Sequence, residues 1–81
     1  MTDSKITLYI KNNSGKSLPM TFSRNEKIGA IKERILEVEG VPEHGYRLIF
    51  AANDLDSEKT IHEYNLQDGS TLHMIGRLRG G

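Results

Sequence analysis

The 81-residue sequence contains no cysteine. Without a thiol, the chain can form no disulfide, no thiolate metal site and no cysteine nucleophile of its own. Any chemistry that passes through a thiol would therefore need a partner's cysteine. The absence also fits a reducing compartment, and we predict a protein of the cytoplasm and nucleus.

The sequence also lacks an excess of charge and a long hydrophobic run. Lysine and arginine together number 11, as do aspartate and glutamate, so the formal net charge is zero. No overall field favours nucleic acid or anionic lipid, and no apolar segment reaches the roughly 20 residues needed to cross a bilayer. We therefore predict one soluble, monomeric domain that binds neither nucleic acid nor membrane.

Catalytic and metal-binding patterns are absent as well. The three histidines, His44, His62 and His73, fall in different predicted elements, and no serine or acid accompanies them at a recognisable spacing. No pair of histidines or carboxylates lies at the spacing of metal ligands. We predict no catalytic residue, no metal and no cofactor, and therefore a protein that is not an enzyme.

Alternating apolar residues predict two strands near the start of the sequence. Residues 6–10 show the period-two pattern of a strand with one buried face, and residues 18–22 repeat it. Between them, Asn-Asn-Ser-Gly at 12–15 favours a hairpin turn. Pro19 cannot donate to a ladder, which predicts that the second strand lies at an edge of its sheet.

An amphipathic pattern predicts one helix of about three turns in the middle of the sequence. Isoleucines recur at helical spacing within residues 28–35, and Gly40 followed by Pro42 predicts where the helix ends. Asn25 is the best candidate for the N-terminal cap. Gly29 falls in the first turn, where we expect fraying because glycine disfavours helix.

The second half of the sequence predicts three more strands. Residues 46–50 form the third, residues 51–54 a turn, and a short strand follows around Leu55. Residues 56–67 lack a clean period and predict a structured connection with a short 3₁₀ turn, before a last strand at 71–75. The order β-β-α-β-β-β predicts an α+β fold, a mixed sheet packed on one face against one helix.

The same alternation leaves two isoleucines on the other face of the sheet. In the third strand Arg47 and Ile49 must point away from the core. In the last strand His73 and Ile75 do the same. If the two strands are neighbours, the isoleucines form an apolar spot on which a partner can dock. Single exposed apolar residues are also ordinary, so both interpretations stay open.

The last six residues contain three glycines, two arginines and one leucine, and they follow the last apolar alternation. Fraying is the ordinary behaviour of such a tail. In a tail that reacts at its own carboxylate, Gly80-Gly81 could pass through a narrow channel of an enzyme, because neither residue has a Cβ. Arg77-Leu78-Arg79 would then give that partner forked, charge-assisted contacts.

Residues 5–81 resemble ubiquitin over essentially the whole domain, without gaps. The matching blocks are Glu39-Gly40-Val41-Pro42, Arg47-Leu48-Ile49-Phe50-Ala51, Tyr64-Asn65-Leu66-Gln67, Ser70-Thr71-Leu72-His73 and Arg77-Leu78-Arg79-Gly80-Gly81. The resemblance implies a β-grasp domain at residues 6–76. It also implies a polar N-terminal extension at 1–5 and a flexible conjugation tail at 77–81.

The resemblance further implies a protein modifier. An activating enzyme would adenylate the Gly81 carboxylate with ATP and pass it to an enzyme cysteine as a thioester. A conjugating enzyme and a ligase would then deliver it to a lysine of a target protein as an isopeptide bond, which a deconjugating protease would cleave. ATP would bind to the activating enzyme and not to this chain.

By position, Ile49 and Ile75 match two members of the hydrophobic recognition patch of ubiquitin. His73 and Arg47 match the neighbours of that patch, which implies receptors with ubiquitin-binding motifs. The third member of the patch corresponds to Asn13 here. We expect this change to weaken receptors that contact the first hairpin.

Two lysines through which ubiquitin forms chains correspond to Asn53 and Asp68, and neither of these can accept an isopeptide bond. The remaining candidate acceptors are Lys11, Lys16, Lys32 and Lys59. Lys32 lies on the predicted helix, where we expect a structural role. Another departure is Ala52, a non-glycine residue in a turn. Leu36 and Val38 are apolar at helix positions that are polar in ubiquitin, and they are either an extra contact surface or neutral variation of the surface.

Alternative identities stay open within and beyond this family. Lys32-Glu33-Arg34 and Glu58-Lys59-Thr60 resemble Nedd/Rub-type modifiers, which act on cullin scaffolds, whereas Arg77 is typical of ubiquitin. We favour a divergent ubiquitin or a separate modifier with a ubiquitin-type activating enzyme, and a Nedd/Rub-type modifier is the first alternative. The others are a sulfur carrier that ends in a thiocarboxylate and a ubiquitin-like binding domain that is not conjugated.

Overall fold

The computed structural model describes residues 5–12 and 14–76, within which five strands, one α-helix and two 3₁₀ turns follow one another. These elements are β1 (Lys5–Lys11), β2 (Ser17–Ser23), α1 (Ile28–Glu39), η1 (Glu43–Gly45), β3 (Tyr46–Phe50), β4 (Asn53–Asp54), η2 (His62–Tyr64) and β5 (Thr71–Gly76). The predicted order of strands and helix is confirmed, and η2 lies in the predicted connection. The 3₁₀ turn η1 was not predicted.

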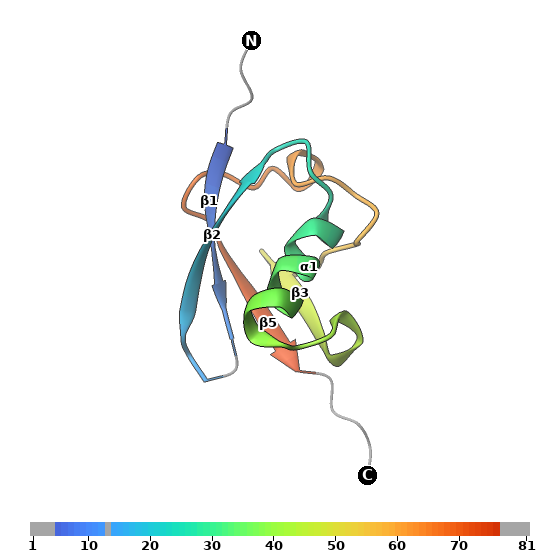
Figure 1. Ribbon diagram of the computed structural model, residues 1–81. Helices are drawn as coiled ribbons and strands as arrows, with labels where there is room; N and C mark the ends of the chain where they lie inside the picture. The colour runs from blue at the N-terminus through green and yellow to red at the C-terminus, as the bar shows by residue number, and fades with distance from the viewer. Residues whose placement is uncertain (1–4, 13, 77–81) are drawn as a thin grey trace.

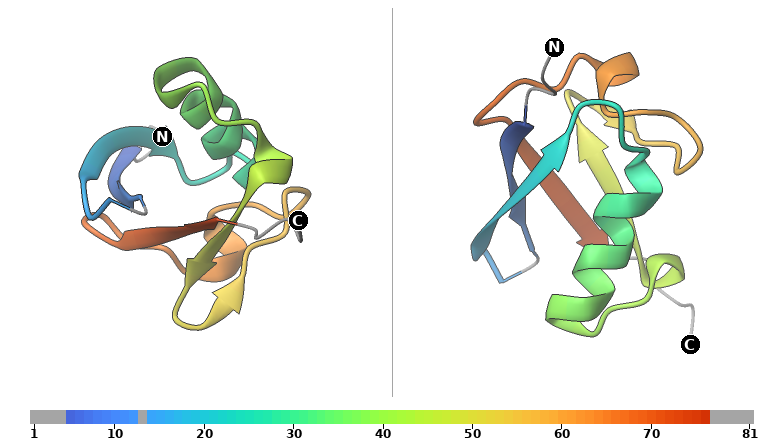
Figure 2. Two further views of the ribbon diagram at one scale, coloured as in Figure 1. Left: turned by 90° about the horizontal axis from the view of Figure 1, so that it is seen from below. Right: turned by 45° about the horizontal axis from the view of Figure 1, so that its top comes forward.

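The strands form one mixed sheet in the order β2-β1-β5-β3-β4. β1 and β5 pair in parallel, whereas β2 pairs with β1, β3 with β5 and β4 with β3 in antiparallel. β2, which contains Pro19, lies at an edge of the sheet as predicted. Figures 1 and 2 show α1, the one α-helix among residues 5–12 and 14–76, crossing one face of the sheet and leaving the other face open. This is the predicted α+β arrangement of the β-grasp fold.

The core lies between the sheet and α1. The predicted inward positions of β1, β3 and β5 are buried, except Phe50, which is half-buried and packs against the core, as Leu18 of β2 does. Replacing one fully buried leucine with alanine would cost about 2–5 kcal/mol, a large fraction of a small domain's stability. The buried residues are Ile6, Leu8, Ile10, Met20, Phe22, Ile28, Ile31, Ile35, Tyr46, Leu48, Leu55, Ile61, Leu66, Leu72 and Met74.

The N-terminus of α1 differs from the prediction. The helix begins at Ile28 with no side-chain cap, so the proposed cap at Asn25 was wrong. Instead, the Ile28 amide donates to the Lys59 carbonyl at 2.8 Å and the Gly29 amide to the Ser57 carbonyl at 3.1 Å. The helix end is thus satisfied by a distant loop, which contradicts the expected fraying. A Cβ on Gly29 would lie 3.4 Å from the carbonyl oxygen of Ser57, at the near limit of ordinary contact.

The C-terminus of α1 follows the prediction. Gly40 adopts a left-handed conformation with φ of 73°, and its amide donates to the Leu36 carbonyl. Glycine reaches this conformation without the steric penalty that a Cβ imposes. The chain turns back here, and η1 packs beside the last turns of α1.

The hairpin between β3 and β4 contains backbone strain. Ala51 and Ala52 form a two-residue turn with φ values of 53° and 69°, the pattern of a type I′ turn, which Asn-Gly sequences favour. The short strand is Asn53–Asp54, slightly earlier than the strand predicted around Leu55. Leu55 is buried directly after it, and its amide donates to the Leu48 carbonyl at 2.9 Å.

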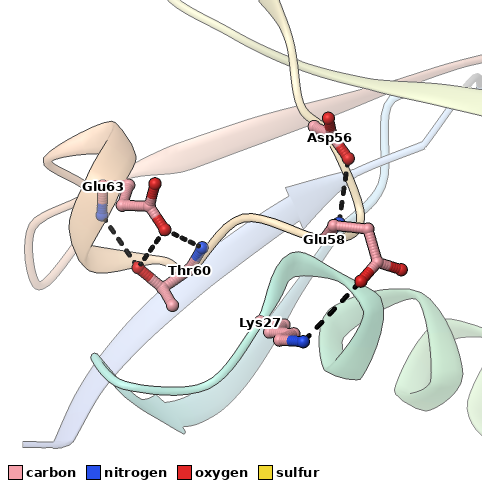
Figure 3. Close-up of polar contacts among 5 residues, drawn as sticks. All are labelled: Lys27, Asp56, Glu58, Thr60 and Glu63. Atoms are coloured by element: carbon pink, nitrogen blue, oxygen red, sulfur yellow. Dashed lines mark hydrogen bonds and ion pairs between the residues drawn. The ribbon is translucent and has the colours of Figure 1, made fainter.

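The connection between β4 and β5 is held by polar side chains. Figure 3 shows Thr60 and Glu63 hydrogen-bonded at the start of η2, and Glu58 in contact with both Asp56 and Lys27. The Glu58 amide donates to Asp56 Oδ1 at 2.9 Å, and Lys27 Nζ lies 3.6 Å from Glu58 Oε1. These contacts position the loop whose carbonyls bind the start of α1.

Candidate recognition surface

Four outward side chains of β3 and β5 lie together on the uncovered face of the sheet. The register places Arg47 opposite Ile75 and Ile49 opposite His73. Side chains directly opposite in an antiparallel pair have Cβ atoms about 4.5–5.5 Å apart, and diagonal neighbours about 7–8 Å apart. Ile49 and Ile75 are such diagonal neighbours. We call Arg47, Ile49, His73 and Ile75 the sheet patch.

The two isoleucines of the sheet patch differ in exposure. Ile75 is 48% exposed, whereas Ile49 is half-buried between its neighbours. The adjacent residues Leu48 and Met74 are buried on the helix side of the sheet. β3 and β5 pair directly, so they are neighbours, as the docking interpretation requires. Of the two isoleucines, Ile75 presents more apolar surface.

The charge of Arg47 is partly satisfied within the chain. Arg47 Nε lies 3.0 Å from Asp54 Oδ2, and β4 places Asp54 opposite Ile49 on the same face. Both side chains are about half exposed, so this ion pair stabilises the fold by less than about 1 kcal/mol. Its main effect is to orient the guanidinium. Asp54 was not predicted as part of the site, although the register of the hairpin was a usable signal.

Lys11 extends the sheet patch onto β1. The parallel pairing of β1 with β5 places Lys11 opposite His73, and Lys11 is exposed. Lys16 and Lys59 are also exposed and lie on other elements. Lys32 is half-buried, and its Nζ donates to Ser57 Oγ at 2.8 Å, so it contacts the same loop that binds the start of α1.

Asp68 and Asn53 occupy the positions at which the resemblance places two chain-forming lysines. The Asp68 carboxylate accepts a hydrogen bond from the Thr7 amide at 2.7 Å, and the Gly69 amide donates to the Thr7 carbonyl at 2.7 Å. The turn that precedes β5 is therefore bound to β1 through Asp68. Asn53 is exposed in β4.

Tyr46 is the last partner of β5 before the tail sequence, since the ladder pairs it with Gly76. Burial, together with the nearby charge of Glu43, raises the pKa of the Tyr46 phenol to about 12. The phenol therefore stays neutral at physiological pH. The residue paired with Gly76 is therefore a buried, uncharged tyrosine.

The three histidines lie apart. His44 is in η1, His62 in η2 and His73 in β5. Among residues 5–12 and 14–76, no group of histidine and carboxylate side chains has the arrangement of a metal site. No helix in the same residues is long and apolar enough to cross a membrane.

The residues predicted to react and to bind the activating enzyme lie outside the described part of the chain. These are Arg77, Leu78, Arg79, Gly80 and Gly81. Asn13, the departure in the first hairpin, lies outside it too.

Comparison with known proteins shows a similarity that spans the domain. The sequence model of the ubiquitin family matches residues 8–79. Ubiquitin-like protein 1 of Schizosaccharomyces pombe is 39% identical over 91% of this chain and 95% of its own length. Ubiquitin-like protein NEDD8 of Dictyostelium discoideum is 39% identical over 91% of this chain and 96% of its own length. NEDD8-like protein RUB3 of Arabidopsis thaliana is 36% identical over 91% of this chain and 95% of its own length.

Proposed function

This chain belongs to the ubiquitin family, and from that premise we propose that it is a protein modifier joined through the Gly81 carboxylate to lysines of target proteins. The match over residues 8–79 carries this proposal, because it includes both the β-grasp domain and the start of the tail. The tail sequence begins directly after Gly76, which belongs to β5 and is paired with Tyr46.

The proposed chemistry needs an activated acyl group. A carboxylate is a poor acyl donor until one of its oxygens becomes part of a good leaving group. Attack of the Gly81 carboxylate on the α-phosphate of ATP would release pyrophosphate, and an enzyme thiolate would then displace AMP. A lysine amine would finally displace that thiol and form the isopeptide bond. This chain supplies the carboxylate and has no cysteine that could compete with the enzyme thiol.

The partners proposed for this reaction are an activating enzyme, a conjugating enzyme, a ligase and a deconjugating protease. Receptors with ubiquitin-binding motifs would dock on the sheet patch, where Ile75 offers apolar surface and Arg47 offers charge. Because the chain has no disulfide to maintain, we place these steps in the reducing cytoplasm and nucleus.

The decisive experiment incubates the chain, ending at Gly81, with ATP, magnesium and a ubiquitin activating enzyme. We expect a conjugate to the activating enzyme that disappears on reduction, and no conjugate from a chain that lacks Gly81. If neither a ubiquitin-type nor a Nedd/Rub-type activating enzyme forms the reducible conjugate, conjugation is ruled out. A non-conjugated binding domain would then be favoured.

A Nedd/Rub-type route is the second candidate, because two of the relatives are named NEDD8 and RUB3. Modifiers of that type act on cullin-like scaffolds. Arg77 argues for the ubiquitin-type route, since Nedd/Rub-type modifiers typically carry alanine there. The two routes therefore differ in which activating enzyme accepts the tail.

Competition between the two activating enzymes separates the routes. The unchanged chain and Arg77→Ala are each offered to both enzymes in one mixture. On the ubiquitin-type route, the unchanged chain loads the ubiquitin-type enzyme, and Arg77→Ala transfers loading to the Nedd/Rub-type enzyme. Preferential loading of the unchanged chain onto the Nedd/Rub-type enzyme would establish the second route instead.

A further inference from the structure

A hollow lies on the helix side of the molecule, away from the sheet patch. It has a volume of about 340 Å³ and is formed between α1 and the segment around η1. We call it the helix hollow, and its lining residues are Lys32, Glu33, Leu36, Pro42, Glu43 and His44. The sheet patch faces the opposite side, because α1 covers the face into which Leu48 and Met74 point.

The helix hollow follows from the way α1 ends. The left-handed conformation of Gly40, with its amide bound to the Leu36 carbonyl, turns the chain back along the helix. Pro42 then precedes η1, whose Gly45 amide donates to the Pro42 carbonyl at 2.9 Å. The turn holds Pro42 and Glu43 across from Leu36 without filling the space between them.

The base of the hollow is apolar. Leu36 is 50% exposed, although the core-facing isoleucines of the same helix are fully buried. Pro42 is also exposed. An exposed leucine beside an exposed proline gives a small apolar surface that an aliphatic side chain can cover.

The rim of the hollow is acidic. The charged Nζ of Lys32 donates to Ser57 Oγ at 2.8 Å, and Ser57 does not line the hollow, so the Lys32 charge is directed away from the rim. Glu33 and Glu43 are exposed, and neither forms an ion pair within residues 5–12 and 14–76. The rim therefore presents two carboxylates that no ion pair among these residues neutralises.

We propose that the helix hollow docks a basic segment of a partner protein, with one aliphatic side chain on Leu36 and Pro42 and a flanking arginine or lysine on Glu33 and Glu43. This combination matches both the apolar base and the free charges of the rim. Because the hollow and the sheet patch lie on opposite sides, one copy of the chain can hold a receptor and this second partner together.

The test uses an acetylated and amidated pentapeptide, Ala-Arg-Leu-Arg-Ala, titrated into the ¹⁵N-labelled full chain. We expect saturable shifts of the amides of Leu36, Glu43 and His44, with weak affinity. The peptide Ala-Glu-Leu-Glu-Ala should not produce them, because its charges repel the rim. No enzyme is needed, so the result is independent of whether Gly81 is conjugated.

Variants identify the contacts. The double variant Glu33→Lys/Glu43→Lys should lower the affinity for the basic peptide by roughly tenfold or more, and Leu36→Asn should remove binding. Glu37→Lys is the matched control, since Glu37 is exposed on α1 but does not line the hollow. It should keep most of the affinity.

Three results would overturn the proposal. The first is the absence of saturable shifts at the hollow in the unchanged chain. The second is a loss of binding free energy in Glu37→Lys that reaches half of the loss in the double variant. Because the double variant reverses two charges and Glu37→Lys reverses one, this would indicate unspecific charge attraction. The third is a difference at the hollow amides between the full chain and a chain ending at Gly76, before any peptide is added. That difference would show that the chain's own tail, which carries Arg77-Leu78-Arg79, occupies the hollow.

Discussion

Thr60 and Glu63 bind each other in both directions. The Thr60 amide donates to Glu63 Oε2 at 3.1 Å, and the Glu63 amide donates to Thr60 Oγ1 at 3.1 Å. This reciprocal pattern is that of a capping box. The pair fixes the end of the loop whose Ser57 and Lys59 carbonyls accept from the first amides of α1, so a local exchange supports a distant helix.

The first prediction concerns Glu63 and pH. The hydrogen bond from the Thr60 backbone lowers the pKa of the Glu63 carboxyl, so the charged form favours the folded state. This contribution is present above the unfolded pKa and is lost as the pH falls through the lower folded pKa. We expect Glu63→Gln to be less stable at neutral pH and to lose less further stability on acidification. Urea unfolding across the acid range measures both effects, with Glu37→Gln as the control. If the free energy of unfolding depends on pH in the same way in Glu63→Gln and in the unchanged chain, the prediction is contradicted.

The second prediction concerns the strained hairpin turn. Ala52 has a φ of 69°, and a left-handed conformation costs a residue with a Cβ about 1–2 kcal/mol. Ala52→Gly removes this cost, although glycine gains entropy in the unfolded chain, and we expect a net gain of about 0.5–1 kcal/mol. Ala30→Gly, in the first turns of α1, should instead destabilise the fold by a similar amount. Thermal or urea unfolding compares the two variants, and a loss of stability in Ala52→Gly would show that the turn is not strained.

The third prediction concerns the sheet patch. Ile49→Ala removes apolar surface from its centre and should weaken binding to a receptor with a ubiquitin-binding motif by roughly tenfold, or about 1–2 kcal/mol. Calorimetric titration gives the affinity, and circular dichroism confirms that the variant stays folded. Ser17→Ala is the control, since Ser17 is exposed on the distant edge strand β2. Unchanged affinity in Ile49→Ala would remove the sheet patch as a docking site.

The fourth prediction concerns the ion pair beside the sheet patch. Asp54→Asn frees the Arg47 guanidinium from its 3.0 Å contact. Because exposed pairs contribute little, the free energy of unfolding should change by less than about 1 kcal/mol. Affinity for an acidic receptor should rise and become more dependent on salt, since the competing carboxylate is gone. Titrations at low and high salt measure this, and a fall in affinity would mean that Asp54 itself contacts the receptor.

Short-range patterns in the sequence predicted much of the fold. Alternation identified β1, β3 and β5, since one face of each strand is buried and the period of two is strict. Gly40 marked the helix end because the left-handed conformation favours glycine. The outward direction of Ile49 and Ile75 followed from the same alternation.

Contacts between distant segments were not predictable in this way. The start of α1 carries no cap because the carbonyls of Ser57 and Lys59, about thirty positions later, take that role. No pattern in the residues around Asn25 predicts that these two carbonyls are the partners. Asp54, beside the sheet patch, is an intermediate case, because residues 51–54 were predicted as a turn and it is the hairpin register that places Asp54 opposite Ile49.

The position of β5 has a mechanical consequence. β5 lies between β1 and β3 and is hydrogen-bonded on both sides, and Gly76 is its last residue. A force applied to Gly76 along the strand would load the hydrogen bonds to both neighbouring strands in shear. Many of these hydrogen bonds would then have to break at the same time. A load across the sheet would instead separate the bonds one after another. The fold should therefore resist extraction through its C-terminal end more strongly than peeling of the edge strand β2.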